Sequence, residues 1–195
     1  MQRPDMNTRR LIRLLPALGI TALLAACATP STGPTIDAVN RHALVRVPAP
    51  EPDWPALKQR LAGATSGLKG IEIGQADKQG LRLQIPVADG FASGKTDIRP
   101  SLAKVLDALA PALAPEEGAA VKVVGHTDSQ GSEMINLQLS IARAEAVVEH
   151  LRQRGVALER LSADGRGEAD PLTSNATEEG RARNRRVELI LSRQP

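Results

Sequence analysis

Aromatic residues are nearly absent from this sequence of 195 residues. Trp54 and Phe91 are the only two, and there is no tyrosine. Proteins that stack on nucleic-acid bases or on sugar faces use aromatic rings for that contact. Neither mode of binding is well supplied here, so we expect recognition to rest on charge and on backbone hydrogen bonds.

An excess of positive charge is also absent outside the N-terminus. The formal net charge is +3, and the first 26 residues carry four arginines against the single acid Asp5, which accounts for all of it. The remaining chain is neutral and lacks the basic surface that neutralises phosphates, so nucleic acid is not an expected partner. Hydrophobic residues make up 42% of the chain, enough for one globular domain of ordinary size plus an extension.

The uncharged run near the N-terminus is too short to cross a membrane. It extends from Leu14 to Ala26, whereas a spanning helix needs about 20 residues. Basic residues followed by a short apolar run that ends in small residues predict an export signal over residues 1–26. Cys27 follows directly and is the only cysteine, so it has no partner for an intramolecular disulfide.

The segment "LAAC", Leu24 to Cys27, resembles the lipobox of bacterial lipoproteins. The resemblance implies that Cys27 becomes the lipidated first residue of the mature chain. In that family an aspartate after the cysteine tends to retain the protein in the inner membrane. Ala28 stands at this position, which implies an anchor in the outer membrane. An incidental free thiol is the alternative interpretation of Cys27.

The chain after the signal divides into three segments. Residues 27–53 are rich in proline, threonine, serine and alanine and lack periodicity, which is typical of a tether. Residues 54–80 contain a short helix that begins at Pro55 and the first strand of a β-hairpin. Whether this segment belongs to the main domain stays open. Residues 81–195 show a regular alternation of strands and helices.

The pattern over residues 81–195 predicts a two-layer fold. Leucine and valine recur at helical spacing after Pro100, and Pro111 is expected to end or kink that helix. A longer helix should end near Arg154, where a basic residue precedes a glycine. The predicted strands are Leu81–Ile85, Ala119–His126, Leu161–Ala163 and Arg185–Leu191. This order indicates the α+β class, a two-layer sandwich with helices packed on one face of a mixed β-sheet of about four strands.

Two arginines occupy positions that should face the core. On the longer helix, Arg143 falls on the apolar side, and on the last strand the alternation places Arg185 on the same face as Val187. Each fits either a structural ion pair at the edge of the core or a contact to a ligand. Asp128 is the available acid. An aspartate beside an arginine can also bind a zwitterion, with one side chain at each charged end.

Two segments carry a family resemblance. The stretch "GHTDSQGSEMINLQLSIARA", which begins at Gly125, and "NRRVEL", which begins at Asn184, resemble the signature of the OmpA C-terminal-like domain. Peptidoglycan-associated lipoproteins and flagellar stator proteins share this domain. The resemblance covers roughly residues 81–191 and includes "FASG" before the first helix.

The resemblance implies non-covalent binding of peptidoglycan through the diaminopimelate of its stem peptide, and an outer-membrane lipoprotein that tethers the membrane to the cell wall. In the family, the aspartate and the arginine that match Asp128 and Arg143 grip the charged ends of diaminopimelate. The binding residues implied here are Thr127, Asp128, Asn136, Leu139, Arg143 and Arg185. The sequence departs from the family at Arg166, where the family usually has an aromatic residue. We expect Arg166 to lie at the rim of the pocket that these binding residues form.

Two alternatives stay open beside this interpretation. His126 and Asp128 lie two residues apart and could act as acid and base or as metal ligands in a wall-acting hydrolase. The other histidines, His42 and His150, are far away in sequence, and there is no HExxH motif or nucleophile elbow. We therefore expect a binding protein without catalytic residues, metal or cofactor. The second alternative is a purely structural lipoprotein with a silent pocket, and the sequence identifies no envelope protein partner.

Overall fold

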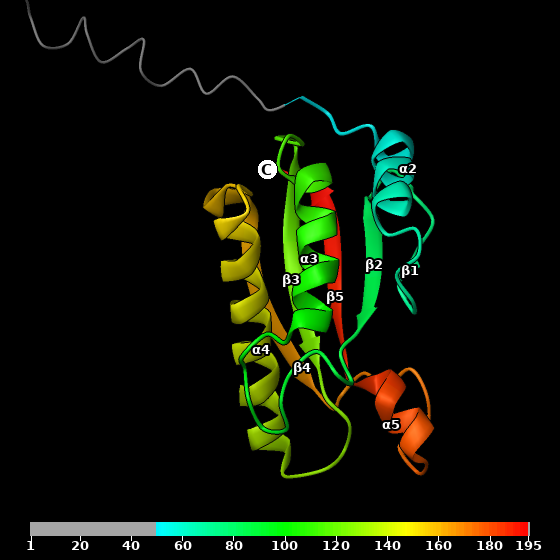
Figure 1. The fold of residues 1–195 in the computed structure, drawn as a ribbon, viewed down its shortest axis with the longest axis vertical. Coiled ribbons are helices and arrows are strands. Elements are labelled where there is room, and N and C mark those ends of the chain that lie inside the picture. The colour runs from blue at the N-terminus through cyan, green and yellow to red at the C-terminus, as the bar shows by residue number, and fades with distance from the viewer. Residues whose placement is uncertain (1–49, 195) are drawn as a thin grey trace, which may run out of the picture. The chain divides into compact units, whose positions relative to one another are not determined.

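The structure is a computed structural model that describes residues 50–194 (Figure 1). The predicted export signal, Cys27 and most of the predicted tether lie outside the described residues. Among the described residues, no helix has both the length and the apolar character needed to cross a membrane.

One five-stranded mixed sheet organises the described residues. The strands are β1 (Glu72–Ile73), β2 (Leu81–Pro86), β3 (Ala119–His126), β4 (Leu161–Gly167) and β5 (Arg186–Arg193). Their spatial order is β1-β2-β5-β3-β4. The β3–β4 pair is parallel and the other three pairs are antiparallel. The predicted hairpin is therefore confirmed as β1 and β2, and the short β1 is the strand that raises the predicted number from about four to five.

The larger helices cover one face of this sheet. The helices are α2 (Trp54–Ala64), α3 (Pro100–Leu113), α4 (Glu133–Gln153) and α5 (Glu178–Asn184), with a 3₁₀ turn at Leu158–Arg160. In Figure 1, α3 and α4 lie side by side in front of the strands. Helix α5 lies at the bottom of the view, below the end at which β5 begins. The predicted two-layer arrangement of helices on a mixed sheet is confirmed. The short α5 was not predicted, because its seven residues contain no apolar stripe.

The hydrophobic core fills the space between the helices and the sheet. Alternation puts the apolar side chains of each strand on this face, so that Leu83 of β2 pairs with Leu189 of β5, and both are buried. Leu57 and Leu61 of α2 belong to the same buried cluster. The segment whose assignment the sequence left open thus packs into the same core as the strands.

The sequence predicted that Pro111 would end or kink α3, and the structure contradicts the first of these two alternatives. Pro111 does not end the helix, which continues to Leu113. A proline in the last turn removes only one backbone hydrogen bond, and burial of Leu113 favours the extra residues. The guanidinium of Arg160 donates hydrogen bonds to the carbonyls of Leu113 and Ala114, 2.9 and 3.0 Å away, which lack partners within the helix.

Two glycines allow α4 to lie unusually close to the sheet. A Cβ atom built on Gly125 of β3 would lie 2.1 Å from the carbonyl oxygen of Ser140 in α4. A Cβ on Gly165 of β4 would lie 2.4 Å from the hydroxyl of the same serine. Since Cβ atoms do not approach backbone so closely, the two glycines fix how near α4 sits to β3 and β4. This distance in turn sets the position of the polar side chains that α4 carries.

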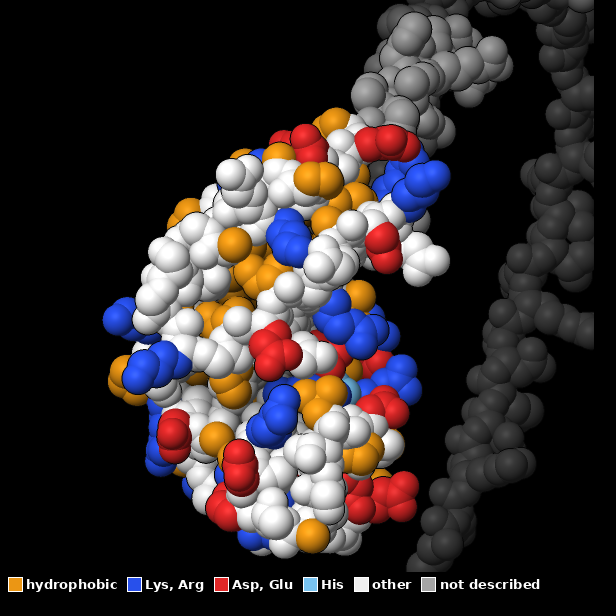
Figure 2. Space-filling model, turned by 90° about the vertical axis from the view of Figure 1, so that its right-hand side faces the viewer, with side chains coloured by type: hydrophobic (Ala, Val, Ile, Leu, Met, Phe, Trp, Pro, Cys, Tyr) orange, Lys and Arg blue, Asp and Glu red, His pale blue; other side chains and the backbone are white. Residues whose placement is uncertain are grey.

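The opposite face of the sheet, which no helix of the described residues covers, is rich in charge. Figure 2 shows basic and acidic side chains gathered on the right-hand side of the described domain. At its centre, Arg186 donates a hydrogen bond of 2.9 Å to Glu188, and both side chains are buried. Lys122 pairs with Asp164 at 2.8 Å nearer to solvent. The two faces of the sheet therefore differ, one being apolar and the other ionic.

Candidate functional site

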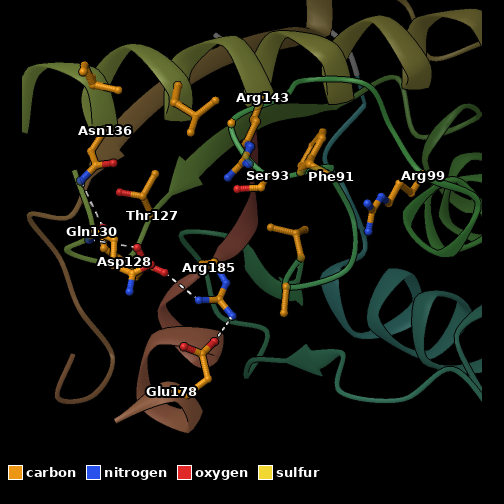
Figure 3. A pocket seen from close by; sticks show the side chains of 15 residues that line it. Phe91, Ser93, Arg99, Thr127, Asp128, Gln130, Asn136, Arg143, Glu178 and Arg185 are labelled. Carbon is orange, nitrogen blue, oxygen red and sulfur yellow. Dashed lines mark hydrogen bonds and ion pairs between the residues drawn. The ribbon is translucent and has the colours of Figure 1, made fainter. Parts of the chain in front are cut away.

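The residues that the sequence assigned to binding come together around one cavity of about 540 Å³ (Figure 3). Those lining it are Thr127, Asp128, Asn136, Leu139, Arg143 and Arg185. They come from three places: the turn after β3, the first half of α4, and the junction between α5 and β5. Cys27, the predicted lipidation site, lies outside the described residues.

Arg143 is nearly buried, with 7% of its surface exposed, and its helix register is the one that the sequence predicted. Its Nε donates a hydrogen bond to the carbonyl of Lys95 at 3.1 Å, and its Nη2 donates to the carbonyl of Ala92 at 3.4 Å. The guanidinium carbon lies 5.0 Å from the ring centre of Phe91, a cation–π distance. The loop before α3 therefore orients the guanidinium from one side.

An ion pair between Arg143 and Asp128, one of the two alternatives that the sequence left open, is not formed in the described residues. Among the ion pairs of the described residues, none involves Arg143. Burial lowers the pKa of Arg143, the charge of Asp128 acts in the opposite direction, and the charge of Arg185 lowers it further. Arginine nevertheless stays protonated in proteins. The cavity thus contains a buried cation whose Nη1 donates no hydrogen bond to the described chain.

Asp128 is paired with Arg185 instead. Its Oδ2 accepts a hydrogen bond of 2.6 Å from Nη1 of Arg185, and its Oδ1 accepts one of 3.0 Å from the backbone N–H of Gln130. Nη2 of Arg185 donates to Glu178 at 2.7 Å. Although burial lowers the pKa of Arg185, its hydrogen bonds to the two carboxylates outweigh burial and raise it. The structural ion pair that the sequence left as an alternative is therefore present for Arg185.

Thr127 and Asn136 differ in what they leave free for a ligand. The hydroxyl of Thr127 is buried and has no hydrogen-bond partner within the described chain. The amide nitrogen of Asn136 already donates to the backbone carbonyl of Asp128 at 3.3 Å and to Glu168 at 2.6 Å. Asn136 therefore braces the turn after β3, and only its oxygen remains available to the cavity.

Sequence reasoning missed part of the cavity wall. Phe91, Ser93 and Arg99, from the loop before α3, and Glu178 of α5 also line the cavity. The segment "FASG" was part of the family resemblance, but no residue in it was given a role. Glu178 is the first residue of α5 and Arg185 directly follows its last residue, so the seven-residue spacing of an acid and a base was the available signal for this pair.

Arg166 does not lie at the rim of this cavity, and that expectation is wrong. Its neighbours Gly165 and Gly167 face α4, where a Cβ atom on either would lie within 3.0 Å of helix atoms. Because strand side chains alternate, Arg166 faces the helix-free side of the sheet and lines a separate cavity there.

His126 and Asp128 do not form a common site, so the acid–base or metal pair of the hydrolase alternative is wrong in geometry. His126, the last residue of β3, lines the cavity on the helix-free side, whereas Asp128 lines the large cavity. Within residues 50–194 no three histidine, cysteine or acidic side chains cluster as metal ligands would. His150 hydrogen-bonds to Asp107 at 2.7 Å on the surface of the helical layer.

Comparison of the sequence with known proteins gives a consistent result. Residues 90–185 match the family model described as the OmpA family. The chain is 33% identical over 165 residues to the peptidoglycan-binding protein ArfA of Mycobacterium tuberculosis strain H37Rv, covering 85% of this chain and 46% of that protein. It is 40% identical over 110 residues to the probable lipoprotein YiaD of Escherichia coli K12, covering 56% and 50%. The chain spans about half the length of the curated relatives it matches.

Comparison of the folds agrees with the sequences. The solved structure of the cell wall anchor of the T6SS from Pseudomonas aeruginosa superposes with a TM-score of 0.63 and 31% identity. The match covers 73% of this chain and 100% of that chain. The family match, the sequence relatives and the fold therefore agree, and the family match at residues 90–185 includes most of the residues that line the cavity. The chain carries an OmpA C-terminal-like domain, and its residues 90–185 belong to the OmpA family.

Proposed function

We propose that the domain binds peptidoglycan non-covalently through the diaminopimelate of the stem peptide. In this proposal the chain is an outer-membrane lipoprotein that tethers the membrane to the cell wall. The observation that carries it is the buried Arg143, which faces the large cavity without an anionic partner among the described residues. A buried cation of this kind is costly unless an anion completes its surroundings.

The free part of Arg143 suits a carboxylate. Its Nε and one hydrogen of Nη2 are used by the carbonyls of Lys95 and Ala92. The two Nη1 hydrogens and the second Nη2 hydrogen remain free. One from each nitrogen can donate to a carboxylate, which gives two parallel hydrogen bonds. The unpartnered hydroxyl of Thr127 lies in the lining of the same cavity and supplies a further polar contact.

The other end of the cavity suits an ammonium group. Asp128 and Glu178 are both held by Arg185, so their positions are fixed before a ligand arrives. Each carboxylate oxygen accepts more than one hydrogen bond and keeps capacity for an ammonium donor. The free end of a diaminopimelate side chain carries one carboxylate and one ammonium, which matches this pair of subsites.

The relatives point in the same direction. ArfA is named a peptidoglycan-binding protein, and the structure from Pseudomonas aeruginosa is described as a cell wall anchor. YiaD is named a probable lipoprotein, which agrees with the lipobox-like segment that ends at Cys27. We propose the division that the sequence predicted: signal over residues 1–26, anchor and tether over 27–53, and wall-binding domain over 81–195, with residues 54–80 packed onto it.

Sedimentation with isolated sacculi tests this proposal. We expect the full chain, extracted in detergent, to pellet with sacculi and to release no soluble muropeptides from them. Failure to pellet would defeat the binding function. Release of muropeptides would instead indicate a hydrolase.

The first prediction concerns the wall chemistry. Wall with lysine in place of diaminopimelate lacks the side-chain carboxylate, so Arg143 loses its partner, and we expect binding about 10-fold weaker. Pelleting on the two wall types at increasing sacculus concentration measures the difference. Free diaminopimelate should compete with wall binding and free lysine should compete poorly. Equal retention on both walls would reject the assignment to diaminopimelate while leaving wall binding intact.

The second prediction concerns the anchor. Cys27→Ser should abolish labelling of the protein with fatty acid and move it from the membrane fraction to the soluble fraction, because in this proposal the lipid is attached to the sulfur of Cys27. Retention of the variant protein on sacculi should not change, since the first residue that lines the binding cavity, Val87, lies 60 residues further along the chain. A Cys27→Ser protein that still carries the label would refute the lipoprotein interpretation.

A further inference from the structure

A second cavity, of about 180 Å³, lies on the helix-free face of the sheet. Its charged and polar lining consists mainly of Arg82, Lys122, His126, Arg166, Arg186 and Glu188. These side chains come from β2, β3, β4 and β5, on the face opposite to the hydrophobic core. The cavity shares no lining residue with the large one, so it is a separate site.

His126 is the buried residue of this cavity whose ring nitrogens lack hydrogen-bond partners in the described chain. Its side chain is 4% exposed, and neither ring nitrogen has a hydrogen-bond partner within residues 50–194. Glu188 Oε1 lies 3.8 Å from Nε2, too far for a hydrogen bond. A neutral imidazole has one donor and one acceptor, and buried groups of this kind are almost always partnered. A group from outside the described chain should therefore occupy the space beside the ring.

The two arginines at the mouth of the cavity have donors to spare. Arg82 is 3.5 Å from Glu188, and Arg166 is 3.9 Å from Asp164, distances of loose ion pairs rather than of charge-assisted hydrogen bonds. Both side chains are more than half exposed. They belong to β2 and β4, so they approach from opposite sides of the strand that carries His126. Arg186, by contrast, is engaged by Glu188 and by backbone carbonyls.

The charge balance of the lining selects the sign of the ligand. The lining has four cations, at positions 82, 122, 166 and 186, and two carboxylates, Asp170 and Glu188. Asp164 lies beside the lining and pairs with Lys122, so a surplus of one positive charge remains. A metal ion would meet this surplus of positive charge, whereas an anion would be attracted by it. Donors that come from three strands, in several directions, fit the oxygens of a tetrahedral oxyanion better than the two coplanar oxygens of a carboxylate.

We propose that this cavity binds a phosphate group, with His126 as the buried donor and Arg82 and Arg166 as the guanidinium donors at the mouth. The group can belong to free phosphate or to a phosphate ester such as a lipid headgroup. This site is independent of the wall-binding cavity and does not rest on the function proposed for it.

The protonation of His126 provides a readout. Burial, with the charges of Arg186 and Arg166, lowers the pKa of His126 to about 4, although the charges of Glu188 and Asp170 act in the opposite direction. The ring is therefore neutral near pH 7 and donates through a single N–H. A phosphate bound beside the ring adds negative charge and should raise this pKa.

The test is a phosphate titration of the full chain in detergent, followed by NMR of ring-labelled histidine at constant ionic strength, with His126→Asn to identify the signal. We expect a saturable shift of the His126 signal with a Kd on the order of 1 mM and an upward shift of its pKa. Arg82→Gln and Arg166→Gln should each weaken binding about 5-fold or more, by loss of one charged contact. Arg60→Gln, a half-exposed arginine of α2 that is paired with Glu116, is the matched control and should not change it.

Glycerol phosphate distinguishes the two sources of the ligand. Tighter binding than inorganic phosphate assigns the site to a phosphate ester, and equal or weaker binding assigns it to the free ion. If neither compound gives a saturable shift up to about 50 mM, or if the shift persists in both arginine variants, the proposal is overturned. Water alone would then supply the hydrogen-bond partners of the His126 ring.

Discussion

Arg143→Ala is expected to leave the domain folded and to weaken its binding to sacculi by on the order of 100-fold. The guanidinium is buried in the wall of the large cavity, and its Nη1 end is the unpartnered donor that a ligand carboxylate would meet. Truncation removes a bidentate charge-assisted contact in a place where water replaces it poorly. Pelleting of the full chain with increasing amounts of sacculi measures the loss.

Stability should change little in the same variant. Because Asp128 is paired with Arg185, loss of Arg143 leaves no buried carboxylate without a partner. The variant loses two hydrogen bonds to loop carbonyls and the contact with Phe91, but it also loses the cost of a buried cation. We expect a net decrease of about 1 to 2 kcal/mol in the free energy of unfolding.

Two further variants make this result specific. Arg143→Lys keeps the charge but lacks the planar fork, so it should restore little of the binding. Arg152 lies on the exposed side of the same helix and, among the described residues, pairs only with Glu149. The Arg152→Ala variant should therefore bind sacculi as the unmodified chain does. A strongly destabilised Arg143→Ala protein that still pellets would return Arg143 to a purely structural role.

Side-chain periodicity was sufficient to predict most of the fold. The period of α4 correctly placed Arg143 on its buried side, and strand alternation correctly placed Val187 and Leu189 in the core. These predictions succeed because burial of apolar surface favours one face of each element. Helix α5 escaped the same test because it packs few apolar residues and is held by polar contacts at its ends.

The partner of each arginine could not be predicted from the sequence. Asp128 and Arg185 are separated by 57 residues, and their pairing depends on how α5 leads into β5. The carbonyls that orient Arg143 belong to the loop that precedes α3. Every residue type has a backbone carbonyl, so the sequence does not reveal which ones contact Arg143. Arg166 was misplaced because the family resemblance alone put it at the rim of the cavity. The predicted strand ended at Ala163, but β4 continues to Gly167, and side-chain alternation turns Arg166 to the other face of the sheet.

Gly125→Ala is expected to destabilise the domain by on the order of 3 kcal/mol or more. The new methyl group would lie 2.1 Å from the backbone carbonyl oxygen of Ser140, and no side-chain rotation relieves a contact with backbone. Helix α4 would have to move away from β3 by about 1 Å, which opens the core beneath it. Thermal unfolding of the full chain in detergent should show a Tm lower by about 10 °C.

Gly63→Ala is the matched control for this change, because a Cβ at Gly63, in the last turns of α2, meets no atom within 4 Å. Alanine favours a helix more than glycine does, so we expect this variant to be unchanged or more stable by about 0.5 kcal/mol.

The folded fraction of Gly125→Ala should also bind sacculi more weakly, since α4 carries both Asn136 and Arg143 into the cavity. Unchanged stability in Gly125→Ala would mean that α4 does not rest on β3 as closely as the structure shows, and the geometry derived for Arg143 would then have to be revised with it.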